Sequence, residues 1–145
     1  DPMAMLPFCG YNYGDYFAHW LSMKDRTDES KLPKIFFVNW FRRDEDGRFL
    51  WPGFGENSRV LKFVFERCNG QGDVVDTAIG KLPTKESLDL DGLTIDDADL
   101  EAILSVDTQG WKNALPQIRD HFAQFGDKLP HDFDDAVDEL EAALA

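Results

Sequence analysis

Residues 39–57 read NWFRRDEDGRFLWPGFGEN, and this stretch decides how the chain folds. It carries five large aromatic side chains: Trp40, Phe41, Phe49, Trp51 and Phe54. Pro52, Gly53 and Gly55 interrupt both helix and strand patterns within four positions. We therefore predict a charged turn over 42–48, tightest at Asp46-Gly47, followed by an irregular loop over 49–57.

Aromatic rings on a stiff, glycine-bearing loop have two interpretations. They can wall a slot for a flat ring, because glycine lets the backbone approach the polar edge of a ligand. Asn57, with one acceptor and two donor hydrogens, could complete the recognition of that edge. The alternative is a small aromatic core that pins the loop, which is the commoner use of clustered aromatic residues.

The sequence around this stretch predicts regular elements on both sides. Upstream we expect a helix over 14–24, a polar loop over 25–33 and a buried strand over 34–39. Downstream we expect a helix over 58–68, capped by Asn57 or Ser58, whose inner face would be Val60, Leu61, Val64, Phe65 and Cys68.

The remainder of the chain is predicted to be mostly helical. A short extended piece is expected over 75–82 and helices over 97–104, 108–125 and 132–144, the second broken or kinked at Pro116. The fold class is therefore α+β, with short strands and an aromatic Pro/Gly loop followed by several helices. We treat residues 1–145 as one domain with an aromatic-rich half, 1–72, and an acidic half, 73–145.

Charge and length exclude several classes of protein. The formal charge is −13, and all of it comes from residues 73–145, which contain 18 Asp and Glu but 5 Lys and Arg. Such a surface repels phosphate backbones, so nucleic acid is not an expected partner. The longest apolar run, Ile35 to Val38, has four residues, whereas a helix that spans a bilayer needs about 20, so no membrane partner is expected either.

Other catalytic signatures are missing from the sequence. There is no GxxxxGK[ST] motif, and Asp89 to Glu101 resembles a calcium loop in composition only, because its glycine, Gly92, is misplaced. Three histidines lack ligand spacing, so we predict neither catalytic nor metal-binding residues here. Cys9 and Cys68 are expected to be free, buried thiols in a cytoplasmic protein, with one disulfide between them as the alternative.

Several segments resemble the C-terminal region of the GTP-dependent phosphoenolpyruvate carboxykinases. They are DPMAMLPFCGYNYGDYFAHWLSM from residue 1, FFVNWFRRDEDGRFLWPGFGENSRVLKF from residue 36, TAIGKLPTKESLDLDGL, and the closing GWKN and IRDHFAQFGDKLP. The resemblance covers essentially the whole chain and is most specific over 1–67. It implies that the chain is a C-terminal segment of a larger α/β enzyme, which agrees with a start at Asp1-Pro2 without Met.

The resemblance also implies roles for individual residues. Phe41 and Phe54 would sandwich the guanine, Phe49 would line the pocket and Asn57 would bind the base edge. Trp40, beside the sandwich, is a weaker candidate. The family usually has A-M-R-P-F-F-G-Y-N near the start, whereas this chain has Leu6 and Cys9 at two of those positions, which makes substrate contacts there less transferable.

In the family, oxaloacetate is decarboxylated and the enolate is phosphorylated by GTP, giving phosphoenolpyruvate, GDP and CO2. The resemblance implies a gluconeogenic lyase whose P-loop, Mn2+ and Mg2+ ligands, reactive cysteine and lid lie outside this segment. Guanine nucleotide and the rest of the same polypeptide are the expected partners, and we expect a monomer. The segment alone is predicted to be inactive.

Two other hypotheses stay open at this point. The chain could be a free-standing guanine-nucleotide-binding or interaction module derived from that fold, without catalysis. It could also be a purely structural domain, in which case Phe41 and Phe54 would pack face to face and leave no slot.

Overall fold

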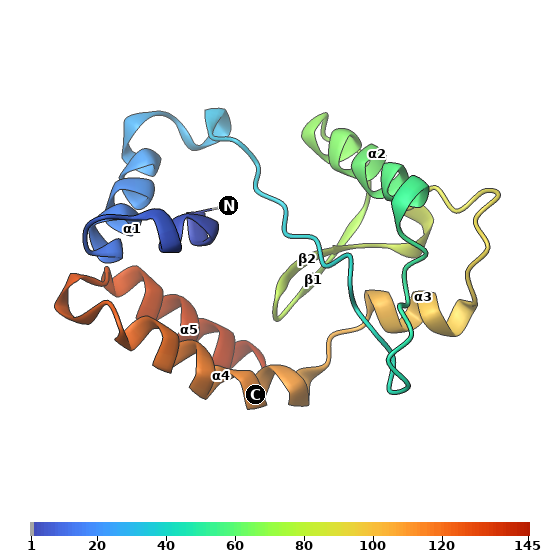
Figure 1. Ribbon diagram of the computed structural model, residues 1–145. Helices are drawn as coiled ribbons and strands as arrows, with labels where there is room; N and C mark the ends of the chain where they lie inside the picture. The colour runs from blue at the N-terminus through green and yellow to red at the C-terminus, as the bar shows by residue number, and fades with distance from the viewer. Residues whose placement is uncertain (1) are drawn as a thin grey trace. The chain divides into compact units, whose positions relative to one another are not determined.

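The structure, a computed structural model, describes residues 2–145 (Figure 1). The chain forms two compact units. Unit 1 combines the chain up to Pro33 with Asp107–Ala145, and unit 2 is Lys34–Val106. The acidic residues after position 72 are therefore divided between the two units. Unit 1 is mainly helical, and among residues 2–145 one two-stranded antiparallel sheet forms, in unit 2, which confirms the predicted α+β class.

Unit 1 consists of helices only among the described residues. Its elements are η1 (Pro2–Phe8), α1 (Tyr13–Leu21), η2 (Ser22–Arg26), η3 (Glu29–Lys31), α4 (Thr108–Ala123), η6 (Gly126–Lys128) and α5 (His131–Ala143). The helix predicted over 14–24 is thus an α-helix that continues as a 3-10 turn. Asn12 caps α1 by accepting from Gly14 N at 2.8 Å, and its Nδ2 donates to Phe125 O at 3.1 Å.

Aromatic rings from both ends of the chain form the core of unit 1. Tyr13, Phe17 and Phe125 are buried together, and the Phe17 ring lies 4.4 Å from that of Phe133. The two departures from the family pattern, Leu6 and Cys9, pack against this cluster. Both are therefore used as core contacts of unit 1.

Gly14 is required by a close backbone approach. A Cβ at this position would lie 2.3 Å from the Lys128 carbonyl oxygen, so no larger residue fits without a shift of the backbone. Helix α1 and η6 meet at this point, which makes the glycine a structural element of unit 1.

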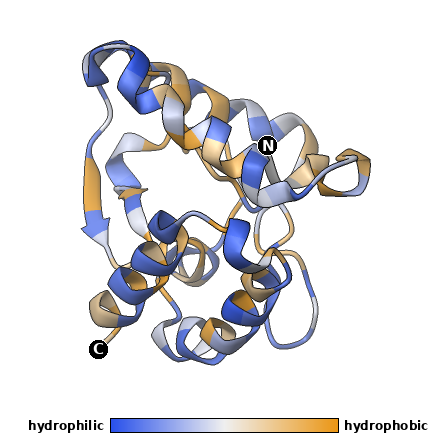
Figure 2. Ribbon diagram, turned by 90° about the vertical axis from the view of Figure 1, so that its left-hand side faces the viewer, coloured by the Kyte–Doolittle hydropathy of each residue, from blue (hydrophilic) through white to orange (hydrophobic). Residues whose placement is uncertain are grey.

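Helices α4 and α5 lie side by side (Figure 1). Leu115 of α4 and Val137 of α5 are buried, whereas the acidic residues of α5 are exposed. Figure 2 shows the helix that ends at the C-terminus as mostly hydrophilic with hydrophobic positions between, as expected for an amphipathic surface helix.

Of the break or kink predicted at Pro116, the break is wrong, because α4 continues through this residue. Proline removes one backbone donor, and the carbonyl four residues earlier loses its partner. Pro116 is exposed, so that carbonyl lies toward the solvent side of the helix, where water can bond it.

The buried strand predicted over 34–39 is also wrong. Residues 33–39 have no regular structure, and Ile35 and Phe37 are 86% and 94% exposed. An extended segment becomes a strand only when a neighbouring strand bonds to its backbone. No residue between positions 2 and 145 pairs with this segment in a sheet.

Instead of one extended piece over 75–82, the structure has a hairpin. β1 (Val74–Thr77) pairs antiparallel with β2 (Gly80–Pro83), with Val75 opposite Leu82 and Ala78-Ile79 as the connecting residues. The hairpin is followed by η5 (Lys85–Ser87) and α3 (Asp97–Leu104), the latter as predicted.

Helix α2 (Asn57–Cys68) forms as predicted but buries a different face. The inner ring is Phe63, 7% exposed, whose edge lies against Gly72. Phe65, placed on the inner face by its spacing, is 71% exposed, and Leu61 and Cys68 are exposed as well. Both cysteines are free as predicted, but only Cys9 is partly buried.

The predicted cap of α2 also differs. Asn57 is the first residue of the α-helix rather than its cap, and the 3-10 turn η4 (Phe54–Glu56) precedes it directly. The Ser58 hydroxyl donates to the Gly55 carbonyl at 2.8 Å, which ties the aromatic loop to the start of the helix.

Candidate functional site

The charged turn predicted over 42–48 is a narrow antiparallel ribbon. Arg43 and Phe49 form a β-bridge, and two hydrogen bonds flank it: Leu50 N donates to Arg42 O, and Asp44 N donates to Arg48 O, both at 3.0 Å. Gly47 turns the chain with a φ of 82°. The ribbon fixes which side each neighbouring side chain occupies.

One side of this ribbon presents aromatic rings. The rings of Phe41 and Phe49 lie 6.1 Å apart at an angle of 59°, and the Arg43 guanidinium lies 4.1 Å above the Phe49 ring. Phe41 is 72% exposed and Phe49 is 45% exposed. Two predicted site residues are therefore together on an accessible surface, with a cation beside them.

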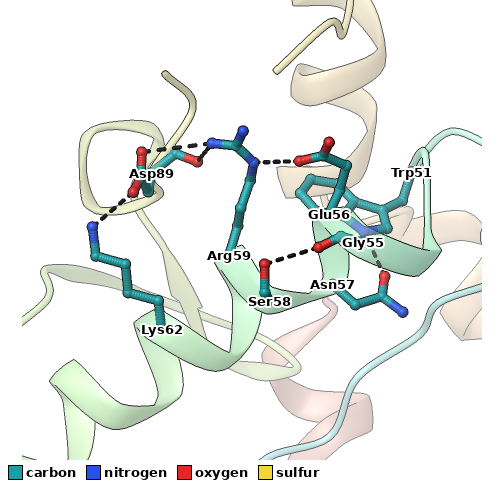
Figure 3. Close-up of polar contacts among 8 residues, drawn as sticks. All are labelled: Trp51, Gly55, Glu56, Asn57, Ser58, Arg59, Lys62 and Asp89. Atoms are coloured by element: carbon teal, nitrogen blue, oxygen red, sulfur yellow. Dashed lines mark hydrogen bonds and ion pairs between the residues drawn. The ribbon is translucent and has the colours of Figure 1, made fainter. Parts of the chain in front are cut away.

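The opposite end of the aromatic stretch is anchored by Trp51. Its ring is buried, and its Nε1 donates to Asn57 Oδ1 at 2.9 Å (Figure 3). The acceptor of Asn57 is thus occupied by the protein. Its Nδ2 donates to no group within residues 2–145, so the two amide hydrogens are the part of Asn57 that a ligand can use.

Phe54 is the most unusual residue of the stretch. Its φ is 46°, in the left-handed region that residues with a side chain rarely adopt, and it follows Gly53, whose φ is 77°. Such a conformation costs about 1–3 kcal/mol. The ring is nevertheless 97% exposed, so it gains almost no burial in the described part of the chain.

The purely structural interpretation predicts that Phe41 and Phe54 pack face to face, and the described residues do not show this packing. Phe54 does not pack against Phe41 in an aromatic core; the loop is pinned instead by Leu50 and Trp51, which are buried. Trp40 is half-buried at the start of the ribbon. The structure brings Phe41 to Phe49 and Trp51 to Asn57, while Phe54 stands apart on its 3-10 turn.

A network of charged side chains lies beside the aromatic loop and was not predicted. Arg59 pairs with Glu56 and donates to the Asp89 carbonyl at 2.7 Å, and Lys62 pairs with the Asp89 carboxylate at 2.7 Å (Figure 3). The hydrogen bond from Lys62 lowers the pKa of Asp89. The spacing of Glu56 and Arg59 was the signal in the sequence for the first of these pairs.

Two shallow hollows border this network. One, of about 440 Å³, is lined by polar groups that include Lys62, Asp73 and Asp89, and another, of about 320 Å³, lies between Glu56 and Asp91. Neither is lined by a predicted site residue. Both are mixed in charge, and their cations, Arg59 and Lys62, are already paired.

The described residues supply no metal centre: nowhere in 2–145 do three His, Cys, Asp or Glu side chains converge on one point. Across the same residues, every helix is too short or too polar to cross a membrane.

Comparison with known proteins decides the family. A family model described as "Phosphoenolpyruvate carboxykinase C-terminal P-loop domain" matches residues 1–143. The chain belongs to the GTP-dependent phosphoenolpyruvate carboxykinases. The resemblance seen in the aromatic stretch and in the opening segment is thereby confirmed.

Relatives named phosphoenolpyruvate carboxykinase (GTP) match the chain from end to end. The protein of Neocallimastix frontalis is 55% identical over 145 residues, that of Treponema pallidum 48% over 145 residues, and that of Renibacterium salmoninarum 51% over 144 residues. Each match covers 99% of this chain but 24% of the relative. The chain thus spans about a quarter of the length of these carboxykinases.

Proposed function

We propose that this chain forms the guanine-binding part of a GTP-dependent phosphoenolpyruvate carboxykinase, which converts oxaloacetate and GTP into phosphoenolpyruvate, GDP and CO2. The observation that carries the proposal is Phe54, a 97% exposed ring held in a strained backbone conformation. Strain without any gain in burial is typical of a residue that meets a ligand.

The aromatic residues would hold the base by stacking. Phe41 and Phe54 would contact its two faces, with Phe49 lining the pocket and Trp40 at its margin. A base stacked on an aromatic ring gains about 1–3 kcal/mol. Arg43, above Phe49, adds a positive charge close to where an anionic nucleotide would lie.

Asn57 would distinguish guanine from adenine. Because its oxygen accepts from Trp51, only its amide hydrogens face a ligand. Guanine presents the acceptor O6 where adenine presents an amino donor. A donor of Asn57 would be satisfied by guanine and left unpaired by adenine, at a cost of about 1–3 kcal/mol.

The remainder of a carboxykinase polypeptide would supply the other chemical groups. The P-loop, the ligands of Mn2+ and Mg2+ and the lid would lie there, since this sequence has no GxxxxGK[ST] motif. The exposed Ile35 and Phe37 mark where that polypeptide would pack, by adding a neighbouring strand to residues 34–39. We further propose that the complete protein is a cytoplasmic monomer.

A nucleotide titration tests this function. The full-length protein is titrated with GDP and with ADP while tryptophan fluorescence is followed, since Trp51 is bonded directly to Asn57. We expect at least tenfold tighter binding of GDP, equivalent to about 1.4 kcal/mol. Equal affinities for GDP and ADP would contradict the site. The segment 1–145 alone should bind weakly and show no GTP-dependent turnover of oxaloacetate.

A further inference from the structure

The ribbon over residues 42–50 has two chemically different sides. In an antiparallel pair, residues opposite each other share a side and the next residues point to the other. Phe41, Arg43 and Phe49 share the aromatic side. Arg42 and Arg48 therefore point the opposite way, and each is directly adjacent in sequence to one of the two rings.

That opposite side is bound to α3 at both ends of the helix. Arg48 forms a bidentate salt bridge with Asp99 near the start of α3: Nη1 donates to Oδ2 at 2.8 Å and Nη2 to Oδ1 at 2.7 Å. Arg42 donates from Nη1 to the carbonyl oxygens of Ile103 and Ser105 at the end of α3, both at 3.1 Å. In Figure 1 the turn of the ribbon lies beside α3.

The contact of Arg42 supplies a hydrogen-bond donor to a backbone carbonyl that has no donor within α3. The last carbonyls of an α-helix have no donor within the helix, and the C-terminus carries partial negative charge. Arg42 Nη1 bonds one such oxygen, that of Ile103, and the oxygen of Ser105 directly after the helix, while Nη2 lies 3.5 Å from the Ser105 hydroxyl; lysine has one nitrogen and cannot make the contact from two. The hydrogen bond from Arg48 lowers the pKa of Asp99, because this contact favours the charged carboxylate.

We propose that Arg42 and Arg48 are positioning residues for guanine: they fix the ribbon on α3 and thereby set the place of Phe41 and Phe49. The inference rests on the proposed function. Helix α3, which carries none of the predicted site residues, becomes the support of one wall of the pocket. Neither arginine is expected to touch the nucleotide.

The test compares variants of the full-length enzyme by steady-state kinetics. Arg42→Ala is expected to raise the KM for GTP about tenfold, with kcat at saturating GTP and the KM for oxaloacetate unchanged. Arg42→Lys should give a smaller rise, since its ammonium can still donate to the carbonyls but cannot also make the Nη2 contact with the Ser105 hydroxyl. A purely structural role would reduce the amount of folded enzyme, which lowers the apparent kcat and leaves both KM values unchanged.

A matched control comes from another contact on the same helix. Lys85 pairs with Asp97 of α3 at 2.7 Å but belongs to η5, not to the ribbon. Lys85→Ala removes a charged contact from α3 and should leave the KM for GTP unchanged. A KM for GTP that rises equally in Lys85→Ala would show that any weakening of α3 has this effect, and would overturn the role of Arg42.

Phe54→Ala, measured in parallel, separates the two proposals. If it raises the KM for GTP while Arg42→Ala and Arg42→Lys do not, the pocket stands and the positioning role is wrong. If it leaves the KM for GTP unchanged, the proposed guanine site itself fails. Should Arg42→Ala not fold, Arg48→Met, which removes the contact with Asp99, decides instead, and an unchanged KM for GTP in that variant overturns the inference.

Discussion

Replacing Phe54 with alanine removes a ring that the described structure leaves 97% exposed, so the folded state loses almost no buried surface. If the ring stacks on guanine, the variant loses about 1–3 kcal/mol of binding. That corresponds to a roughly 5–150-fold rise in the KM for GTP. The melting temperature of the full-length enzyme should barely change.

Phe63→Ala is the opposite perturbation. Phe63 is 7% exposed on the inner face of α2, and truncation of a buried phenylalanine costs about 3–5 kcal/mol of folding stability. Its melting temperature should fall clearly, whereas the KM for GTP of the enzyme that remains folded should be unchanged. Phe65→Ala, an exposed ring on the same helix, should also leave the KM for GTP unchanged.

The assay is a GTP titration at saturating oxaloacetate, together with thermal unfolding of each variant. A further substitution, Phe54→Gly, removes the strain at φ 46° and should raise stability by about 1 kcal/mol while weakening GTP use as alanine does. If Phe54→Ala destabilises the enzyme as strongly as Phe63→Ala, Phe54 is a core residue in the complete protein and the stacking argument is refuted.

Three further outcomes concern stability. Tyr13→Phe should raise the free energy of unfolding in urea by about 1 kcal/mol, because the buried Tyr13 hydroxyl has no hydrogen-bond partner among the described residues; a loss of stability would reveal a hidden partner. Gly14→Ala should lower it by about 2 kcal/mol or more, since a Cβ would lie 2.3 Å from the Lys128 carbonyl oxygen; a neutral result would contradict this close approach. Arg48→Met should lower the free energy of unfolding, and this loss should reach its maximum above about pH 4, the pKa of an unfolded aspartate. The loss should vanish as the pH falls through the lower pKa that Asp99 has in the folded protein. A loss that does not depend on pH would exclude this ion pair.

Local patterns predicted most of the helices. The elements at 97–104 and 132–144 formed with boundaries within one residue, because their apolar spacing and acidic first turns are local properties. The break at Pro116 failed because proline at an exposed position removes only one hydrogen bond, which the neighbouring turns of a 16-residue helix outweigh.

The candidate site was predictable in composition but not in arrangement. The sequence showed that rings, glycines and an amide gather over 39–57, and a family resemblance supplied their roles. It did not show that Asn57 gives its oxygen to Trp51, because that bond depends on how the loop closes onto α2. It also did not show that Arg42 and Arg48 form hydrogen bonds with α3, more than fifty residues away in the chain.

The sequence by itself determined the family, the α+β class and the position of the aromatic loop, since these follow from residue identity and short-range spacing. The tertiary structure alone decided which surfaces are buried. Spacing placed Phe65 on the inner face of α2, yet Phe63 fills it, with its ring edge close to Gly72. Residues 34–39 have the composition of a buried strand but remain exposed, because burial and sheet pairing need a partner segment that no local pattern can specify.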